Sequence, residues 1–358
     1  MEKFGFVGLP NAGKSSLYNA LTGGSALAAP YAFATTDPNI GVAKVTDERL
    51  DQLAEMSSSK KVVAASVQFN DIGGLVEGAS QGEGLGNKFL AGIREVDAIV
   101  FVLRAFKDDD VPGPQDPIEH LRIVETELTL ADLETVSTKV NKLERAAKGD
   151  SGLKAELEAA QFVLAELEEG NPLYRVKMTE DMHEIVDSWL LLTNKPVLAI
   201  VNVDEGQLDQ VDEITAPVIA DLPDTASTFG VCVQLEAEAA QLDKEDRAEM
   251  LGELGLGEGV LPTFLAQAYK SLGLRTFFTT GEQESRAWTF RDGSPAPVCA
   301  GRIHTDMQRG FIRAETVHWD ELLEAKSWGS ARESGKIRAE GKDYLVKDGD
   351  VLEFRFNV

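Results

Sequence analysis

Short, continuous runs of apolar residues recur along the first two thirds of the chain. Such runs are typical of parallel strands that are buried on both faces of a sheet. Polar or glycine-rich stretches follow them, which indicates loops at the carboxyl ends of the strands. The pattern predicts an α/β sheet built from residues 4–7, 62–70, 98–103, 197–201 and 228–233.

From Pro117 the apolar spacing changes to the period of helices. Residues 149–152 form a turn signal between two such stretches. We therefore expect an antiparallel hairpin of two long helices, inserted between the strands at 98–103 and 197–201. The exposed faces of the hairpin are charged, which contact with water explains. The alternative is that the tip of the hairpin binds a partner. The periodic positions are Leu121, Val124, Leu128, Ala131, Leu133, Val136, Val140, Leu143, Ala147, Leu153, Leu157, Ala160, Leu164 and Leu167.

The last segment of the chain changes character again. Residues 276–280, 286–290 and 351–356 have the composition of strands, and 347–350 form a turn before the last of them. The pattern predicts a small β-rich domain with one helix near 320–326. We find no catalytic constellation in it, and expect an interaction module.

The composition indicates a protein of the reducing cytoplasm. A chain of 358 residues is long enough for two or three domains. We find no apolar run near the roughly 20 residues that span a bilayer and no evident signal peptide, so we expect no membrane contact. Cys232 and Cys299 lie far apart, and the four histidines lack ligand spacing.

The net charge of −25 argues against a broad electrostatic contact with nucleic acid, so we expect no sequence-specific DNA binding. The charge is uneven. Residues 275–358 hold 13 Lys and Arg against 14 Asp and Glu, a net of −1. This segment is the better candidate for a face toward an anionic partner, and a domain that is simply less acidic is an equal alternative.

The strand at 4–7 leads into Gly8-Leu-Pro-Asn-Ala-Gly13-Lys14-Ser15, which is the P-loop pattern G-x-x-x-x-G-K-S before a predicted helix. Glycines allow consecutive backbone N–H groups to face an anion, and the helix N-terminus adds partial positive charge. Lys14 can reach the β- and γ-phosphates, and the Ser15 hydroxyl can ligate Mg²⁺.

Two later stretches fit the same chemistry. Residues 28–39 form a loop in which a threonine can join Mg²⁺ and sense the γ-phosphate. Asp71 ends a strand, where we expect a second-shell anchor for Mg²⁺, and Gly74 can donate its N–H to the γ-phosphate. Leu75 occupies the position of a water-orienting glutamine in Ras-type enzymes, which predicts slow hydrolysis or another group that positions the water.

The strand at 197–201 ends in Asn202-Val203-Asp204-Glu205, where a GTPase has N-K-x-D. The aspartate of that motif accepts hydrogen bonds from guanine, and its lysine packs along the base. Because Val203 and Glu205 replace these residues, we expect weak selection of guanine and a preference for adenine. Residues 234–236 are expected to form a loop that closes over the base.

Read together, these motifs resemble the YchF-type, Obg-like ATPases of the translation-factor P-loop class. The resemblance covers essentially the whole chain. It includes residues 8–16, 31–39, 71–75, 82–87, 202–205, 275–279, 286–289, 303–306, 309–315 and 340–344.

The resemblance implies a P-loop nucleotide-binding domain at 1–117 and 195–274. It also implies an inserted coiled-coil helical domain at 118–194 and a C-terminal, β-grasp-like TGS domain at 275–358. The implied activity is Mg²⁺-dependent ATP hydrolysis, with ATP preferred over GTP. The implied partner is the ribosome, with the large subunit as the expected site.

Site residues follow from the resemblance position by position. Lys14 and Gly74 are the expected catalytic groups, and Ser15, Thr35 and Asp71 the expected Mg²⁺ positions. The loop near Leu235 is expected to contact the base through its backbone. The expected nucleotide-binding set is Asn11, Ala12, Gly13, Lys14, Ser15, Ser16, Asn202, Glu205 and Leu235.

The chain departs from the family pattern at two places. Gly73 replaces a usual alanine, which should matter little. The family often has a histidine after the strand at 98–103, with a suspected role in hydrolysis, and residues 106–117 contain none. His120 lies beyond this loop, on the predicted helix, and we do not assign that role to it. The group that positions the water therefore stays open.

Two other functions are consistent with the residues. One is a GTP-specific, translation-associated GTPase, which competition between ATP and GTP would distinguish. The other is a binding module with a structural nucleotide, which predicts that Lys14→Ala leaves partner binding unchanged.

Overall fold

The computed structural model describes the chain except for residues 1, 23–39, 73–84, 109–112, 258 and 358. It divides into two compact units. The first comprises Met1–Val42 and Gln68–Phe264, and the second comprises Ala43–Val67 and Leu265–Val358.

A six-stranded sheet in the order β2-β4-β1-β5-β6-β7 forms the centre of the first unit. β1 pairs in parallel with β4 and β5, and β6 pairs in parallel with β5 and β7. The apolar runs therefore form the expected parallel sheet, whose carboxyl ends share one edge. The strands are β1 (Lys3–Val7), β2 (Ile40–Val45), β4 (Ala65–Asp71), β5 (Ala98–Arg104), β6 (Val197–Asn202) and β7 (Ser227–Val231).

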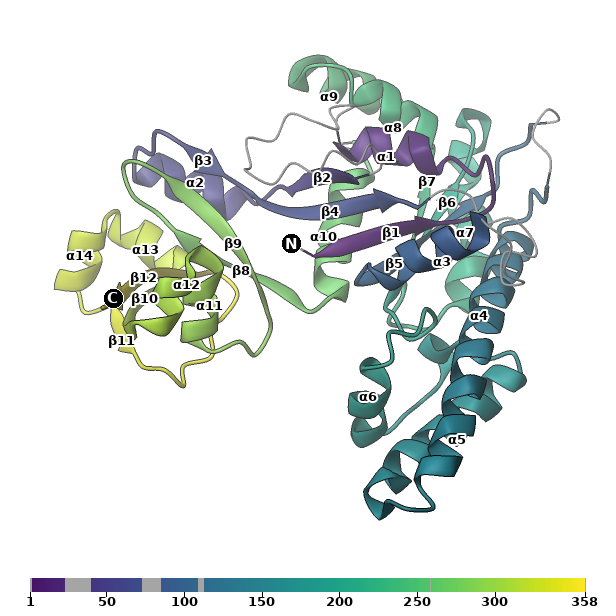
Figure 1. Ribbon diagram of the computed structural model, residues 1–358. Helices are drawn as coiled ribbons and strands as arrows, with labels where there is room; N and C mark the ends of the chain where they lie inside the picture. The colour runs from purple at the N-terminus through teal and green to yellow at the C-terminus, as the bar shows by residue number, and fades with distance from the viewer. Residues whose placement is uncertain (1, 23–39, 73–84, 109–112, 258, 358) are drawn as a thin grey trace. The chain divides into compact units, whose positions relative to one another are not determined.

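Helices of the first unit follow these strands along the chain (Figure 1). β5 is buried along its whole length, as its continuous apolar sequence predicts. The helices are α1 (Lys14–Thr22), α3 (Leu85–Arg94), α4 (Pro117–Ala146), α5 (Lys154–Glu168), α6 (Glu180–Asp187), α7 (Val211–Asp221), α8 (Val233–Ala239) and α9 (Lys244–Glu253). A further helix, α10 (Leu261–Ser271), begins in the first unit, and its residues from Leu265 on belong to the second.

The predicted helical hairpin is confirmed as α4 and α5, joined through a short 3-10 turn, Ser151–Leu153 (Figure 1). Asp116 caps α4, and Pro117 occupies its first turn. The two halves of α4 serve different cores. Leu121, Val124 and Leu128 pack into the core of the sheet, whereas Val136 and Val140 pack against α5.

Asp132, near the middle of α4, is fully buried. Its carboxylate accepts hydrogen bonds from the backbone N–H groups of Leu192 (3.0 Å) and Thr193 (2.7 Å), and from the Thr193 hydroxyl (2.7 Å). Burial raises the pKa of Asp132, and these hydrogen bonds oppose the shift. The carboxylate therefore fastens α4 to the segment that precedes β6.

The second unit contains a six-stranded sheet in the order β11-β10-β12-β8-β9-β3. The three expected strands are confirmed as β8, β9 and β12. In the described residues from 275 on, four helices (α11–α14) occur where one was expected, because α11, α12 and α14 are too short to show a clear period. The elements are β3 (Val62–Val63), β8 (Leu274–Thr279), β9 (Ser285–Arg291), β10 (Phe311–His318), β11 (Arg338–Glu340), β12 (Asp350–Phe356), α2 (Glu48–Met56), α11 (Ala296–Ile303), α12 (Thr305–Arg309), α13 (Trp319–Ala325) and α14 (Trp328–Glu333).

The segment Ala43–Val67 groups with the C-terminal residues. The strand expected at 62–70 is confirmed from residue 65 on as β4, but its continuity is wrong, because residues 62–63 form β3, which belongs to the other sheet. β3 pairs in parallel with β9, where Val62 lies opposite Ser285. The expected domain boundaries, which placed this segment with residues 1–117, stay a prediction.

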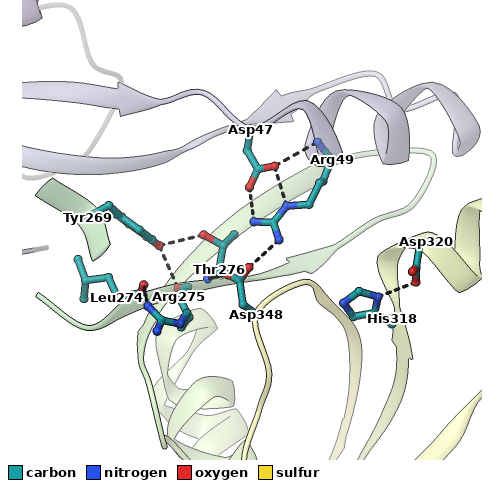
Figure 2. A network of polar contacts seen from close by, with 9 residues as sticks. All are labelled: Asp47, Arg49, Tyr269, Leu274, Arg275, Thr276, His318, Asp320 and Asp348. Atoms are coloured by element: carbon teal, nitrogen blue, oxygen red, sulfur yellow. Dashed lines mark hydrogen bonds and ion pairs between the residues drawn. The ribbon is translucent and has the colours of Figure 1, made fainter. Parts of the chain in front are cut away.

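An arginine network fastens this segment within the second unit (Figure 2). The Arg49 guanidinium donates to both carboxylate oxygens of Asp47, at 2.9 and 2.8 Å, and to Asp348 at 2.7 Å. It also lies over the ring of Phe278, 5.2 Å from the centroid. Asp348 accepts a further hydrogen bond from the backbone N–H of Thr276 at 2.9 Å. Arg49 thus links α2 with β8 and with the turn before β12.

Candidate functional site

The loop between β1 and α1 has a backbone conformation that only certain residue types can adopt. Asn11 and Gly13 both have positive φ angles, 61° and 99°. A Cβ atom on Gly13 would lie 2.3 Å from the Asn202 side chain, and one on Gly8 would lie 2.4 Å from the Val102 carbonyl oxygen. Close packing therefore requires both glycines of the P-loop pattern, and the positive φ angle is a second reason at Gly13.

The Lys14 ammonium group lies against the carbonyl oxygens of its own loop. It donates to Gly8 at 3.0 Å and to Leu9 at 2.7 Å, and the side chain is buried. Burial lowers the pKa of Lys14 to about 8, and the negative charge of Asp71 opposes the shift. An anionic phosphate beside this amine would favour its charged form.

Ser15 and Asp71 come from distant parts of the sequence and meet at the end of the sheet. The Ser15 hydroxyl, in the first turn of α1, donates to the carboxylate of Asp71 at 2.7 Å. Asp71 is the last residue of β4, the neighbour of β1. A hydroxyl and a carboxylate are oxygen ligands of the kind that Mg²⁺ prefers.

Asn202, the last residue of β6, connects the loop to the start of α8. Its side-chain N–H donates to the carbonyl oxygen of Ala12 at 3.0 Å, and its Oδ1 accepts from the backbone N–H of Val233 at 3.1 Å. The side chain is buried, so both hydrogen bonds are shielded from water. Asn202 therefore supports the loop from the side of β6.

His120, the fourth residue of α4, supports the loop from another side. Its Nε2 lies 3.0 Å from the backbone nitrogen of Leu9, and its Nδ1 lies 2.8 Å from that of Arg104, the last residue of β5. The ring is 1% exposed. The sequence analysis did not assign His120 to the site, because helical spacing alone does not show which strand ends a helix faces.

The residues expected near the base differ in burial and in the element that carries them. Val203 is buried, and its backbone N–H donates to the carbonyl oxygen of Val231 at 3.0 Å. Glu205 is exposed and begins a short 3-10 helix, Glu205–Gln210. The loop expected at 234–236 is wrong, because α8 begins at Val233 and Leu235 is buried in the core of the sheet.

Some of the remaining predicted site residues lie in the described loop and in α1, and others lie outside the described residues. Ala12 is buried, whereas Asn11 and Ser16 are exposed on the loop and in the first turn of α1. Thr35, Gly74 and Leu75 lie outside the described residues. Within the described part of the chain, no group of three or more His, Cys, Asp or Glu side chains could hold a metal ion. None of the described helices is long and apolar enough to cross a membrane.

The sequence matches family models in two regions and is similar to curated proteins over its whole length. A family model described as 50S ribosome-binding GTPase matches residues 3–142, and the C-terminal YchF GTPase model, described as a protein of unknown function, matches residues 274–357. The curated ribosome-binding ATPase YchF of Bacillus subtilis is 45% identical over 361 residues, covering 99% of each chain. The protein of that name from Escherichia coli O157:H7 is 44% identical over 366 residues, again covering 99% of each.

The chain belongs to the YchF family. The resemblance inferred from the motifs is therefore confirmed, and so is the expected fold class. A solved structure of the Schizosaccharomyces pombe YchF GTPase superposes with a TM-score of 0.87 at 34% identity, covering 99% of this chain and 97% of that one. A GTP-binding protein from Pyrococcus horikoshii has a TM-score of 0.64 at 18% identity, and covers 100% of both chains. The YchF relatives are thus named partly as ATPases and partly as a GTPase, which makes the choice of nucleotide the question for this chain.

Proposed function

We propose that this protein is a Mg²⁺-dependent ATPase that binds the ribosome and acts as a slow nucleotide switch. The observation that carries the proposal is the loop after β1, where Lys14 and the Ser15–Asp71 pair lie beside the glycine-dependent backbone. Curated relatives with full-length similarity are named ribosome-binding ATPases, which supports the same activity.

In this proposal the loop residues bind the triphosphate. The backbone N–H groups from Asn11 to Ser16 face the phosphates, and the Lys14 ammonium group neutralises charge on the β- and γ-phosphates. Asn202 and His120 hold the loop in shape, through Ala12 and Leu9. Gly74 is proposed to donate its N–H to the γ-phosphate, as its position after Asp71 predicts.

The oxygen donors of Ser15 and Asp71 fit Mg²⁺, because a hydroxyl and a carboxylate already lie 2.7 Å apart beside Lys14. Ser15 would hold the ion directly, with Thr35 as the second protein ligand and Asp71 in the second shell. When bound, Mg²⁺ supplies charge neutralisation at the β- and γ-phosphate oxygens.

ATP is proposed as the preferred nucleotide because of the residues after β6. Position 203 is a buried valine, which has no ammonium group and no long side chain to pack along a base. Glu205 carries its carboxylate one methylene further than the aspartate that pairs with guanine. Adenine has no N1–H or 2-amino group that could donate hydrogen bonds to such a carboxylate. Replacing the aspartate therefore removes no interaction with ATP.

A direct test is ATP hydrolysis by the purified protein with Mg²⁺ and with excess EDTA. Hydrolysis that requires Mg²⁺ and is lost in Ser15→Ala supports the proposal. Asn19→Ala, an exposed position on the same helix, is the matched control and should hydrolyse ATP like the unmodified protein. Hydrolysis that is equal in EDTA, or equal in Ser15→Ala, would contradict the assignment of the site.

Ribosome association is tested separately by co-sedimentation. We propose that this interaction takes place in the cytoplasm. The proposed binding site is on the large ribosomal subunit. Purified 30S, 50S and 70S particles should be compared with and without a non-hydrolysable ATP analogue. Sedimentation with 50S and 70S but not 30S particles is expected, and sedimentation with none of them would contradict this part of the proposal.

A further inference from the structure

Leu9, in the loop after β1, has hydrogen-bond partners at both its backbone N–H and its carbonyl oxygen. Its carbonyl oxygen accepts from the Lys14 ammonium group at 2.7 Å. Its backbone N–H points to Nε2 of His120 at 3.0 Å. A single residue of the loop thus connects the lysine that is proposed to bind phosphate with a histidine on α4.

The position of His120 is fixed by the helix that carries it. α4 is capped by Asp116, whose side chain accepts from the backbone N–H of Ile118 at 2.8 Å. The next residue of the helix, Leu121, is fully buried in the core of the sheet. The imidazole therefore enters the site from a rigid element, and Leu9 is held against it.

The backbone N–H groups around the His120 ring need a hydrogen-bond acceptor. Two backbone N–H groups, of Leu9 and Arg104, converge on its two nitrogens. A neutral imidazole has one unprotonated nitrogen and so accepts from one of these groups at a time, whereas a carboxylate could accept from both. Protonation of the ring is opposed by burial and by the positive charges of Lys14 and Arg104. The site thus uses His120 as a hydrogen-bond acceptor.

We propose that His120 is a positioning residue of the ATPase, which sets the Leu9 peptide and thereby the Lys14 ammonium group for binding the triphosphate. It acts through Leu9 and transfers no proton during hydrolysis. This inference rests on the proposed ATPase function. It assigns a role to a histidine whose place in the sequence gave none.

The acceptor role predicts an ordered series of variants. His120→Leu, which has no acceptor, should lower kcat/KM for ATP about tenfold or more, the equivalent of about 1.4 kcal/mol. In His120→Gln the side-chain oxygen can take the place of Nε2 opposite the Leu9 N–H, so this variant should stay within about threefold of the unmodified protein, which is under 1 kcal/mol. In His120→Asn the shorter side chain reaches only the place of Nδ1, opposite Arg104, so this variant should bind ATP more weakly than His120→Gln. Glu119→Gln, at the exposed neighbouring position, is the matched control and should change nothing.

The experiment is steady-state hydrolysis of Mg²⁺-ATP from pH 6 to 8, with circular dichroism to verify that each variant is folded. Equal activity of His120→Leu and the unmodified protein would overturn the inference. So would a His120→Gln variant as inactive as His120→Leu, or one with a different pH profile, because glutamine cannot carry a proton. If His120→Leu does not fold, the order of His120→Gln and His120→Asn in ATP affinity decides, and equal or weaker binding by His120→Gln overturns the inference. An unmodified protein that does not hydrolyse ATP would instead refute the proposed function.

Discussion

The side-chain amide of Asn202 donates a hydrogen bond to the carbonyl oxygen of Ala12 at 3.0 Å. These residues are 190 positions apart in the sequence, and they join the end of β6 to the phosphate-binding loop. The same amide accepts from the backbone N–H of Val233. The base motif and the phosphate loop are thus parts of one hydrogen-bonded unit.

Asn202→Ala should weaken both folding and nucleotide binding. It leaves the Ala12 carbonyl and the Val233 N–H without this partner in a buried place, which costs about 1–3 kcal/mol for each lost partner. Urea unfolding and ATP titration measure the two effects. Asn202→Asp keeps the acceptor for Val233 but loses the donor for Ala12, so it should retain part of the stability. An Asn202→Ala protein with unchanged ATP affinity would show that Ala12 needs no support.

Arg49→Ala should destabilise the second unit. The substitution removes a guanidinium that donates hydrogen bonds to Asp47 and Asp348 (Figure 2). The same guanidinium lies over the ring of Phe278. Arg49 is 26% exposed, and we expect a loss of about 1–2 kcal/mol. Lys61→Ala is the control, because Lys61 is 61% exposed in its pair with Glu284 and should cost less than about 0.5 kcal/mol. Equal unfolding midpoints for the two variants would contradict this account.

The protonation of His120 predicts a pH dependence of stability. Burial, with help from Lys14 and Arg104, lowers the pKa of His120 from 6.5 to about 4. Between these values the unfolded chain binds a proton that the folded chain does not, so the free energy of unfolding rises with pH. The stabilisation is complete above pH 6.5 and is lost as the pH falls toward 4.

This effect amounts to about 2 kcal/mol between pH 7.5 and pH 5, from the size of the pKa shift. Urea unfolding of the unmodified protein and of His120→Asn at both pH values isolates it, because asparagine does not titrate. The difference in free energy of unfolding between the two proteins should shift in favour of His120→Asn at pH 5. A difference that is the same at both pH values would show that His120 is not held neutral.

The sequence predicted most of the first unit because its elements have clear periods. The buried strands, Asp71 at the end of β4 and the α4–α5 hairpin follow from continuous or three-to-four spacing. β3 has two residues, too few for any period, and its pairing with β9 depends on residues more than 200 positions away. The helix at Val233 was missed because a short helix of seven residues after a strand resembles a loop.

The site was predicted from motifs, and its supporting residues were not. The glycines, Lys14 and Ser15 belong to a fixed spacing that chemistry explains. His120 and the Asn202–Val233 contact depend on which strand ends meet in three dimensions, and no local pattern contains that information. The residues that support the site through tertiary contacts therefore could not be predicted from the sequence alone.

The central claim is that the residues after β6 select ATP, and equilibrium binding tests it most directly. Kd values for ATP and GTP, with Mg²⁺, should be measured for the unmodified protein and for the double variant Val203→Lys/Glu205→Asp. We expect ATP to be preferred by about tenfold or more, equivalent to about 1.4 kcal/mol, with the preference shifted toward GTP in the double variant. Preference of the unmodified protein for GTP would contradict the account and favour a GTPase.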